Sequence, residues 1–113
     1  MRLINQDVAM VDAVGVPDHA ALELNLAIAD DHLLSVADGL GGHVAGELAS
    51  ALTVRHLAMS WRRDRRALVL TTALKAANRA LYDCMTDCPE HRGMGSTLAG
   101  VHLIGQSAHW FSI

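Results

Sequence analysis

The sequence predicts an α/β fold in which helices are layered on a sheet. Residues 33–37 form an apolar run of the length that suits a buried strand, and glycines end the run. Apolar residues then recur at helical spacing in two long stretches, and two further apolar segments flank Gly105 and Gln106 as paired strands do. At 113 residues the chain has room for one small domain.

The elements before the glycines are predicted to be strands and turns. Residues 7–14 are predicted to form a strand, and residues 15–19 a turn. Apolar residues alternate with others over 24–28, as in a half-buried strand, and residues 30–32 turn the chain into the strand that begins at Leu33. The order of these segments suits a sheet with short connections.

Two helices are predicted after the glycines. The first covers about 44–63, and Asp64 is a candidate N-cap for the second. Residues 88–92 are predicted to form a loop before paired strands over 97–104 and 108–113. The apolar stripes that predict the helices are Val44, Leu48, Leu52 and Met59 in the first, and Leu70, Leu74, Ala77, Leu81 and Met85 in the second.

The corner between the buried strand and the first helix has groups that could bind a metal ion and an anion. Asp38 is predicted to lie at the end of the strand, and Gly39 follows with a carbonyl that no side chain shields. Carboxylate and carbonyl oxygens suit Mg²⁺ or Mn²⁺ rather than zinc. The helix that begins near Val44 directs free backbone N–H groups towards the same corner, where an anion is favoured. The sequence thus predicts a carboxylate next to a site that could bind a phosphate group.

Other glycine-rich phosphate sites fit poorly. A dinucleotide site requires G-x-G-x-x-G, and Gly39 and Gly41 supply the first pair, but Val44 stands at the third position. The acidic residue expected about 20 positions later is absent, since residues 58–63 read Ala-Met-Ser-Trp-Arg-Arg. A Walker loop requires a Lys after the glycines, and none follows.

Three segments resemble the bacterial form of the metal-dependent Ser/Thr protein phosphatases, the PPM or type 2C family. Residues 36–50 follow the pattern V-A-D-G-[ML]-G-G-H-x-A-G-E-x-A-S, residues 2–7 resemble R-x-x-N-[EQ]-D, and residues 93–98 resemble G-M-G-[ST]-T-L. The matches occur in the family's order over nearly the whole chain. The resemblance implies part of a β-sandwich flanked by helices, with two long helices packed on a mainly antiparallel sheet.

The resemblance also implies a catalytic centre with two Mn²⁺ or Mg²⁺ ions that hydrolyses phosphoserine and phosphothreonine in proteins. By resemblance Asp38 bridges the two metals, the Gly39 carbonyl is a further ligand, and Asp7 holds metal-bound water. Arg2 clamps the substrate phosphate, and His43 lies near the leaving group or the substrate. These residue types suit the roles, because two ions together generate a hydroxide nucleophile and a guanidinium binds phosphate in a bidentate fork.

The chain departs from the family pattern in composition and in length. Gln6 stands where many members carry Glu, and Leu40 replaces the commoner Met, which conserves volume. The resemblance implies that residues 1–113 are a single partial domain, the N-terminal half, without the first strand and the C-terminal half. Further Asp ligands are expected in that later half. The alternative function is therefore a catalytically inactive fragment, or a phosphate- or partner-binding module of the same fold, and the isolated chain is expected to be weakly active or inactive.

Composition bears on partners and location. The net charge of −3 predicts no strong attraction to nucleic acid, and no apolar run approaches the ~20 residues of a membrane span. A cytoplasmic globular protein is expected. Charged residues make up only 19% of the chain, and its C-terminal end is apolar. Unpaired sheet edges are therefore expected, and copies of the chain are expected to associate through them.

The two cysteines and most histidines give little sign of a metal site. Cys84 and Cys88 lack zinc-ligand spacing and are predicted to be reduced thiols, with Cys84 buried and Cys88 near a loop. Of the seven histidines only His43 lies in a motif. The others are expected to be surface residues or hydrogen-bonded core residues.

Overall fold

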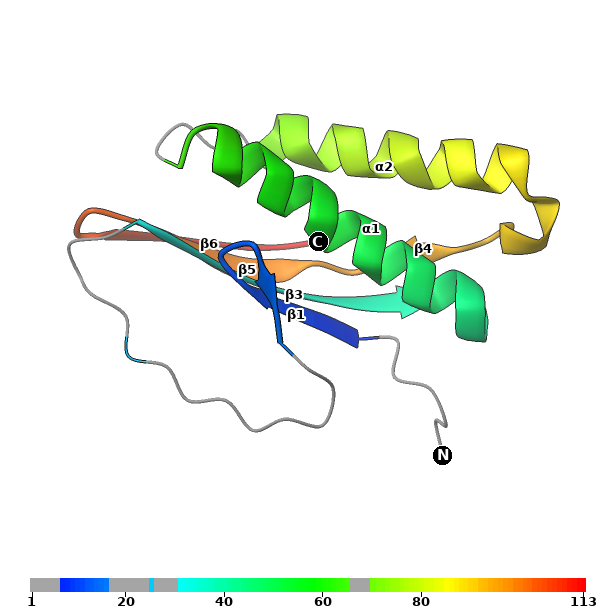
Figure 1. The fold of residues 1–113 in the computed structure, drawn as a ribbon, viewed down its shortest axis with the longest axis horizontal. Coiled ribbons are helices and arrows are strands. Elements are labelled where there is room, and N and C mark those ends of the chain that lie inside the picture. Colours follow the sequence, from blue (N-terminus) through cyan, green and yellow to red (C-terminus); the bar gives the residue numbers. More distant parts are fainter. Residues whose placement is uncertain (1–6, 17–24, 26–30, 66–69) are drawn as a thin grey trace.

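The computed structural model describes residues 7–16, 25, 31–65 and 70–113, which form one antiparallel sheet with two helices on one of its faces (Figure 1). This arrangement confirms the predicted fold class. The elements in chain order are β1 (Asp7–Val11), β2 (Val14–Gly15), β3 (His32–Leu40), α1 (His43–Arg63), α2 (Leu70–Asp87), the 3₁₀ turn η1 (Pro89–His91), β4 (Gly95–Ser96), β5 (Ala99–Ile104) and β6 (Ser107–Ser112).

The strand order is β2-β1-β3-β5-β6, and β4 pairs with the end of β3. Every pairing is antiparallel. β3 is central, and its residues alternate between a buried face towards the helices and a more exposed face. Among the described residues, no helix is both long and apolar enough to cross a membrane.

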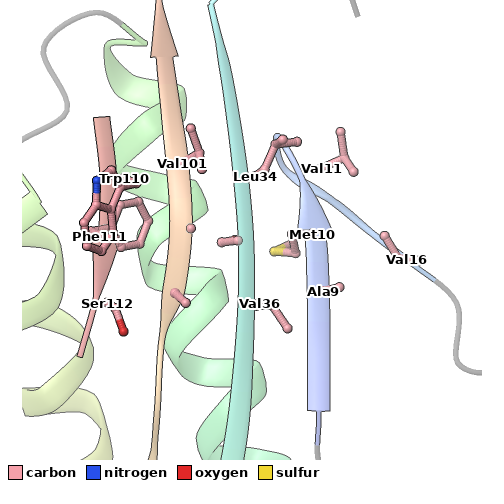
Figure 2. Close-up of a pocket in the computed structure, with 13 residues that line it drawn as sticks. Ala9, Met10, Val11, Val16, Leu34, Val36, Val101, Trp110, Phe111 and Ser112 are labelled. Carbon is pink, nitrogen blue, oxygen red and sulfur yellow. The ribbon is translucent and has the colours of Figure 1, made fainter. Parts of the chain in front are cut away.

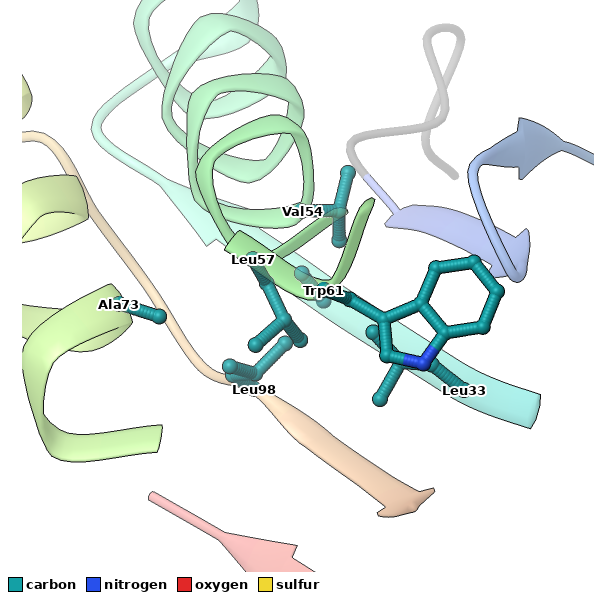
Figure 3. Close-up of a cluster of buried hydrophobic side chains, with 7 residues drawn as sticks. Leu33, Val54, Leu57, Trp61, Ala73 and Leu98 are labelled. Carbon is teal, nitrogen blue, oxygen red and sulfur yellow. The ribbon is translucent and has the colours of Figure 1, made fainter. Parts of the chain in front are cut away.

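The core lies between the sheet and the helices. Trp61 and Leu57 of α1 pack against Leu33 of β3 and Leu98, which precedes β5 (Figure 3). Burying side chains of this size stabilises the fold by about 1.5–3 kcal/mol each. A second cluster lies near the start of α1 and consists of Ala45, Ala49, Leu81 and Met94.

Only the middle of the predicted apolar stripe of α1 faces the core, since Leu48 and Leu52 pack against the second cluster. Val44 is 66% exposed and Met59 is 48% exposed, although both belong to the apolar stripe in the sequence. The buried residues of α1 are instead mostly small ones near its start and large ones near its end. Small side chains let the helix approach the sheet closely at its first turns, and this approach selects the face. The buried apolar side chains of α1 are Ala45, Ala49, Val54, Leu57, Ala58 and Trp61.

Two predicted boundaries are wrong. The strand predicted over 7–14 is broken, because the chain turns at Asp12, whose φ of 58° is in the left-handed region that Asp tolerates. The Asp12 carboxylate accepts a hydrogen bond from Leu33 N at 2.9 Å, which fixes this turn against β3. Asp64 is the C-cap of α1, with an extended backbone, and is not the predicted N-cap of the second helix.

Some predicted segments fall wholly or partly outside the described residues. Of the strand predicted over 24–28, only Asn25 is described, and it lies in no regular element. Of the turn predicted over 15–19, Gly15 belongs to β2 and residues 17–19 are not described. The later segments follow the predicted order, with η1 inside the loop predicted over 88–92.

Candidate functional site

Asp7 and Asp38 lie directly opposite each other on the neighbouring antiparallel strands β1 and β3. Directly opposite residues project from the same face of a sheet, with Cβ atoms roughly 4.5–5.5 Å apart. Both residues are exposed, on the face that points away from the helices. Like charges in this position repel each other, so a divalent cation shared between the two carboxylates would be stabilising. The register therefore joins two acids that are far apart in the sequence.

Residues before β5 fix the backbone of Asp38. Thr97 N donates a hydrogen bond to Asp38 O at 2.9 Å, and the Asp38 N–H donates to Thr97 Oγ1 at 3.2 Å. The Ser96 hydroxyl donates to Asp38 O at 3.3 Å. Because the main chain of Asp38 is held on both its donor and acceptor sides, its side chain leaves the sheet from a fixed position.

Gly39 lets β3 touch α1 without an intervening side chain. A Cβ placed on Gly39 would lie 1.7 Å from Gly46 O, so no other residue fits at this position. Gly41 is similarly constrained, because its φ is 123° and an added Cβ would lie 2.7 Å from Met94 Cα. These contacts set the distance between the strand, the glycine turn and the helix.

The first turn of α1 faces the glycine turn that follows the acids. Gly42 is the N-cap and makes no side-chain cap hydrogen bond, since it has no side chain. No acidic residue lies in the first turn. This helix start therefore retains the partial positive charge that favours an anion nearby.

The structure places the predicted site residues unevenly. It brings Asp7 and Asp38 together and puts Gly39 next to them, but Asp38 lies two residues before the end of β3 and not at the predicted strand end. His43 is the first residue of α1, and its side chain is outside what the structure describes. Arg2 also lies outside the described residues.

Apolar residues cover the remainder of the face that carries the two acids. Figure 2 shows the residues of β1, β3, β5 and β6 that line a shallow hollow of about 520 Å³, and of these Met10 and Phe111 pack towards the core on the other face. Directly paired residues form rows across the strands, and Asp7 with Asp38 ends this series of rows. We call this surface the open face, and two of its rows are Val11-Leu34-Val101-Trp110 and Ala9-Val36-Ala99-Ser112.

The donors at the corner fit part of a divalent cation site. Two carboxylates and a nearby main-chain carbonyl are hard oxygen donors of the kind that Mg²⁺ and Mn²⁺ prefer. Within the described part of the chain, no three His, Cys, Asp or Glu side chains are grouped so that they could hold a metal ion. The described acids at this corner thus provide a partial ligand set.

Sequence reasoning missed the contacts that hold the corner. It did not identify Thr97 and Ser96 as partners of the Asp38 backbone, or Gly46 as the contact of Gly39. A glycine inside a helical pattern usually has a packing reason, so Gly46 was a usable signal. The Thr97 contact had no comparable signal, because it depends on the register of β3 against β4.

Comparisons with known proteins agree on one group. A protein phosphatase 2C-type protein of Streptococcus pyogenes is 35% identical over 82 residues, which cover 67% of this chain and 33% of that protein. The serine/threonine protein phosphatase PstP of Mycobacterium tuberculosis is 37% identical over 76 residues, or 65% of this chain and 15% of PstP. A scan against protein-family models finds no match.

Solved structures agree with the sequence relatives. The crystal structure of the M. tuberculosis phosphatase PstP/Ppp matches all of this chain and 42% of its own, with a TM-score of 0.69 and 31% identity. A serine/threonine phosphatase of S. agalactiae matches 97% of this chain and 42% of its own, with a TM-score of 0.69 and 26% identity. The chain spans about a third of the S. pyogenes relative. Over the matched segment, the chain is therefore a relative of the bacterial serine/threonine protein phosphatases of type 2C.

Proposed function

We propose that this chain carries part of the catalytic centre of a metal-dependent protein serine/threonine phosphatase. The main support is the direct opposition of Asp7 and Asp38 on one sheet face, beside a glycine turn and a helix start. The similarity to type 2C phosphatases supports the same reaction class. The substrate would be a phosphorylated protein, and the reaction would be hydrolysis of phosphoserine or phosphothreonine.

Each residue of the corner has a proposed role. Asp38 and the Gly39 carbonyl would hold the cations, Asp7 would orient water bound to them, and Arg2 would bind the substrate phosphate. His43 would lie near the leaving group. Mn²⁺ or Mg²⁺ ions held there would lower the pKa of a bound water and offset charge on the leaving oxygen. The helix start at Gly42 adds a favourable potential for the phosphoryl group.

The alternative is a catalytically inactive module of the same fold that binds phosphate or a partner. One observation favours it: the described acids at the corner make a partial ligand set. Two carboxylates bind divalent ions more weakly than the larger oxygen cages of high-affinity sites. On this view the chain would bind a phosphorylated ligand without turning it over.

Substitution of Asp38 tests the phosphatase proposal. In Asp38→Asn the side chain keeps its size and loses its charge, so we expect calorimetry to show loss of Mn²⁺ binding. Any Mn²⁺-dependent hydrolysis of p-nitrophenyl phosphate by the wild-type chain is expected to be abolished in this variant, because the metals would carry the reaction. The matched control is Asp83→Asn on α2, an exposed acid 4.0 Å from Arg79.

The outcomes separate the two functions. Hydrolysis that survives Asp38→Asn at the wild-type rate would reject the catalytic assignment. Tight phosphate or phosphopeptide binding by wild type, with no Mn²⁺-dependent turnover at any protein concentration, would favour the binding module. The Asp83→Asn variant is expected to match the wild type in both assays.

We propose a cytoplasmic protein that binds neither nucleic acid nor membranes, and the two free thiols are typical of a reducing compartment. We also propose that copies of the chain self-associate through exposed sheet edges. The edge strand β6 and the open face beside it support this idea, because unpaired edges and apolar patches promote association.

A further inference from the structure

A thiol and an imidazole meet where α2 ends. The Cys84 Sγ atom lies 3.6 Å from His91 Nδ1, within hydrogen-bonding distance for sulfur. Cys84 is in the last turn of α2, and His91 is the last residue of η1. Both are half-buried, at the end of the molecule where the chain leaves α2 and returns towards β4 (Figure 1). The corner of Asp38 uses neither residue.

A second thiol lies in the same turn. The Cys88 N–H donates to Cys84 O at 3.0 Å, and the His91 N–H donates to Cys88 O at 2.9 Å. Two consecutive backbone hydrogen bonds thus connect the three residues. Both cysteines are free and half-buried, whereas the sequence predicted Cys84 to be buried.

A metal site does not explain this cluster. Cys84, Cys88 and His91 are all described, and the described residues contain no group of three such side chains arranged to hold a metal ion. A thiol paired with an imidazole and followed by a second thiol has another use. The imidazole accepts the thiol proton, the resulting thiolate is the nucleophile, and the second thiol resolves the product.

We propose that Cys84, His91 and Cys88 form a peroxide-reactive dithiol site. The Cys84 proton passes to His91 Nδ1, and the sulfur attacks one oxygen of hydrogen peroxide. The S–O bond forms as the O–O bond breaks, and the departing hydroxide takes the proton from the imidazole and leaves as water. Cys84 is then a sulfenic acid.

Cys88 completes the reaction. Its sulfur attacks the Cys84 sulfur, an S–S bond forms, the S–O bond breaks, and the hydroxide leaves as water with the Cys88 proton. The two thiols lose two electrons in total, and one peroxide becomes two waters. The reaction needs neither a metal ion nor phosphatase activity.

The backbone at Cys88 permits this closure. Residues four apart on a helix have Cβ atoms about 5–6 Å apart, whereas a disulfide needs about 3.5–4.5 Å. Cys88 has left the helix, with an extended backbone at φ −134° and ψ 94°. Closure therefore requires a local movement of the α2–η1 junction that brings the two Cβ atoms to about 3.5–4.5 Å.

The dithiol connects to the glycine turn through a short segment. The Met94 N–H donates to His91 O at 3.2 Å, and Met94 is buried against the Gly41 backbone. The dithiol site therefore ends, at His91, three residues before Met94, whose contact with Gly41 positions the glycine turn at the candidate metal site.

Mass spectrometry of the full chain treated with hydrogen peroxide tests the proposal. We expect wild type to lose two hydrogen atoms and to yield one peptide pair linked through Cys84 and Cys88. Cys88→Ser is expected to stop at a Cys84 sulfenic acid that a 1,3-diketone probe traps. His91→Gln is expected to slow Cys84 oxidation by about tenfold or more, because the proton acceptor is removed. The matched control is His109→Gln, on the exposed strand β6.

Unfolding in urea supplies a comparison that needs no variant. We expect Cys84 to react faster than Cys88 in the folded chain and the two to react equally in urea. Equal rates in the folded chain would overturn the proposal, as would an unchanged rate in His91→Gln. Disulfides that form only between chains would also overturn it.

Discussion

At the scale of the residue, Gly39 has the least room for a side chain among the described glycines. An added Cβ would overlap the main chain of Gly46, so strand and helix meet backbone to backbone. Asp38, the preceding residue, has its own backbone fixed by Thr97. The proposed ligand is thus positioned by main-chain contacts on both sides, and single substitutions there test the corner directly.

Gly39→Ala is expected to lower the free energy of unfolding by about 3 kcal/mol or more. The added methyl group would overlap Gly46 O, and either β3 or α1 must move to make room. Urea denaturation followed by circular dichroism measures the change. Gly15→Ala is the control, because nothing lies within 4 Å of its added Cβ, and its effect should be within about 0.5 kcal/mol. Equal stabilities of the two variants would contradict the contact.

The sequence identified Asp38 and Gly39 because their motif is local, but it could not identify how they are held. The opposition of Asp38 to Asp7 depends on the register of two strands that are separated by a long segment. The register of two strands depends on which face of each strand is buried. The sequence does not show which strand face the helices cover, so the register could not be predicted from it. The role of Thr97 was hidden for the same reason.

At the scale of the element, α1 shows why periodicity alone defines the buried face of a helix only in part. Its sequence is apolar on several sides, so the stripe from Val44 to Met59 matches helical spacing, although only its middle residues contact the core. The close approach at Gly46 brings a face of small residues against the sheet, because only small residues fit there. The second helix was predicted better, since Ala73, Ala77 and Leu81 are buried on one face, near its predicted stripe.

Two substitutions on α1 distinguish the faces. Leu57→Ala is expected to lower the free energy of unfolding by about 2–5 kcal/mol, because Leu57 is enclosed by the core and a cavity would remain. Met59→Ala, two residues along the same helix, should change it by no more than about 0.5 kcal/mol. Both are measured by urea denaturation. A larger loss for Met59→Ala would contradict the exposure of Met59 in the structure.

At the scale of the whole molecule, the sheet is covered on one face and open on the other. Both helices pack on the same side (Figure 1), and the open face presents apolar rows that end in the two acids. The layered α/β class followed from the order of apolar segments, since local patterns determine element type. The exposure of the open face could not be predicted, because it depends on which face of the sheet the helices cover.

Self-association through this face has a direct test. Trp110 is 79% exposed on β6, and Trp110→Lys would place a charge on the apolar surface and next to the sheet edge. We expect sedimentation velocity to show a shift from dimers or larger species to monomers. Tyr82→Lys on α2 is the control, since Tyr82 is exposed on the helix layer. A wild-type chain that is monomeric at every concentration would contradict the proposal.

The hydrogen bonds between Asp38 and Thr97 join positions that are 59 residues apart. A ribosome synthesises the chain from its N-terminus, so Asp38 emerges well before the residue that anchors it. Contacts of such long range also form late in folding, because a large loop must close first. Under the proposed function, cations present during translation would meet the Asp38 carboxylate before Thr97 holds its backbone in place.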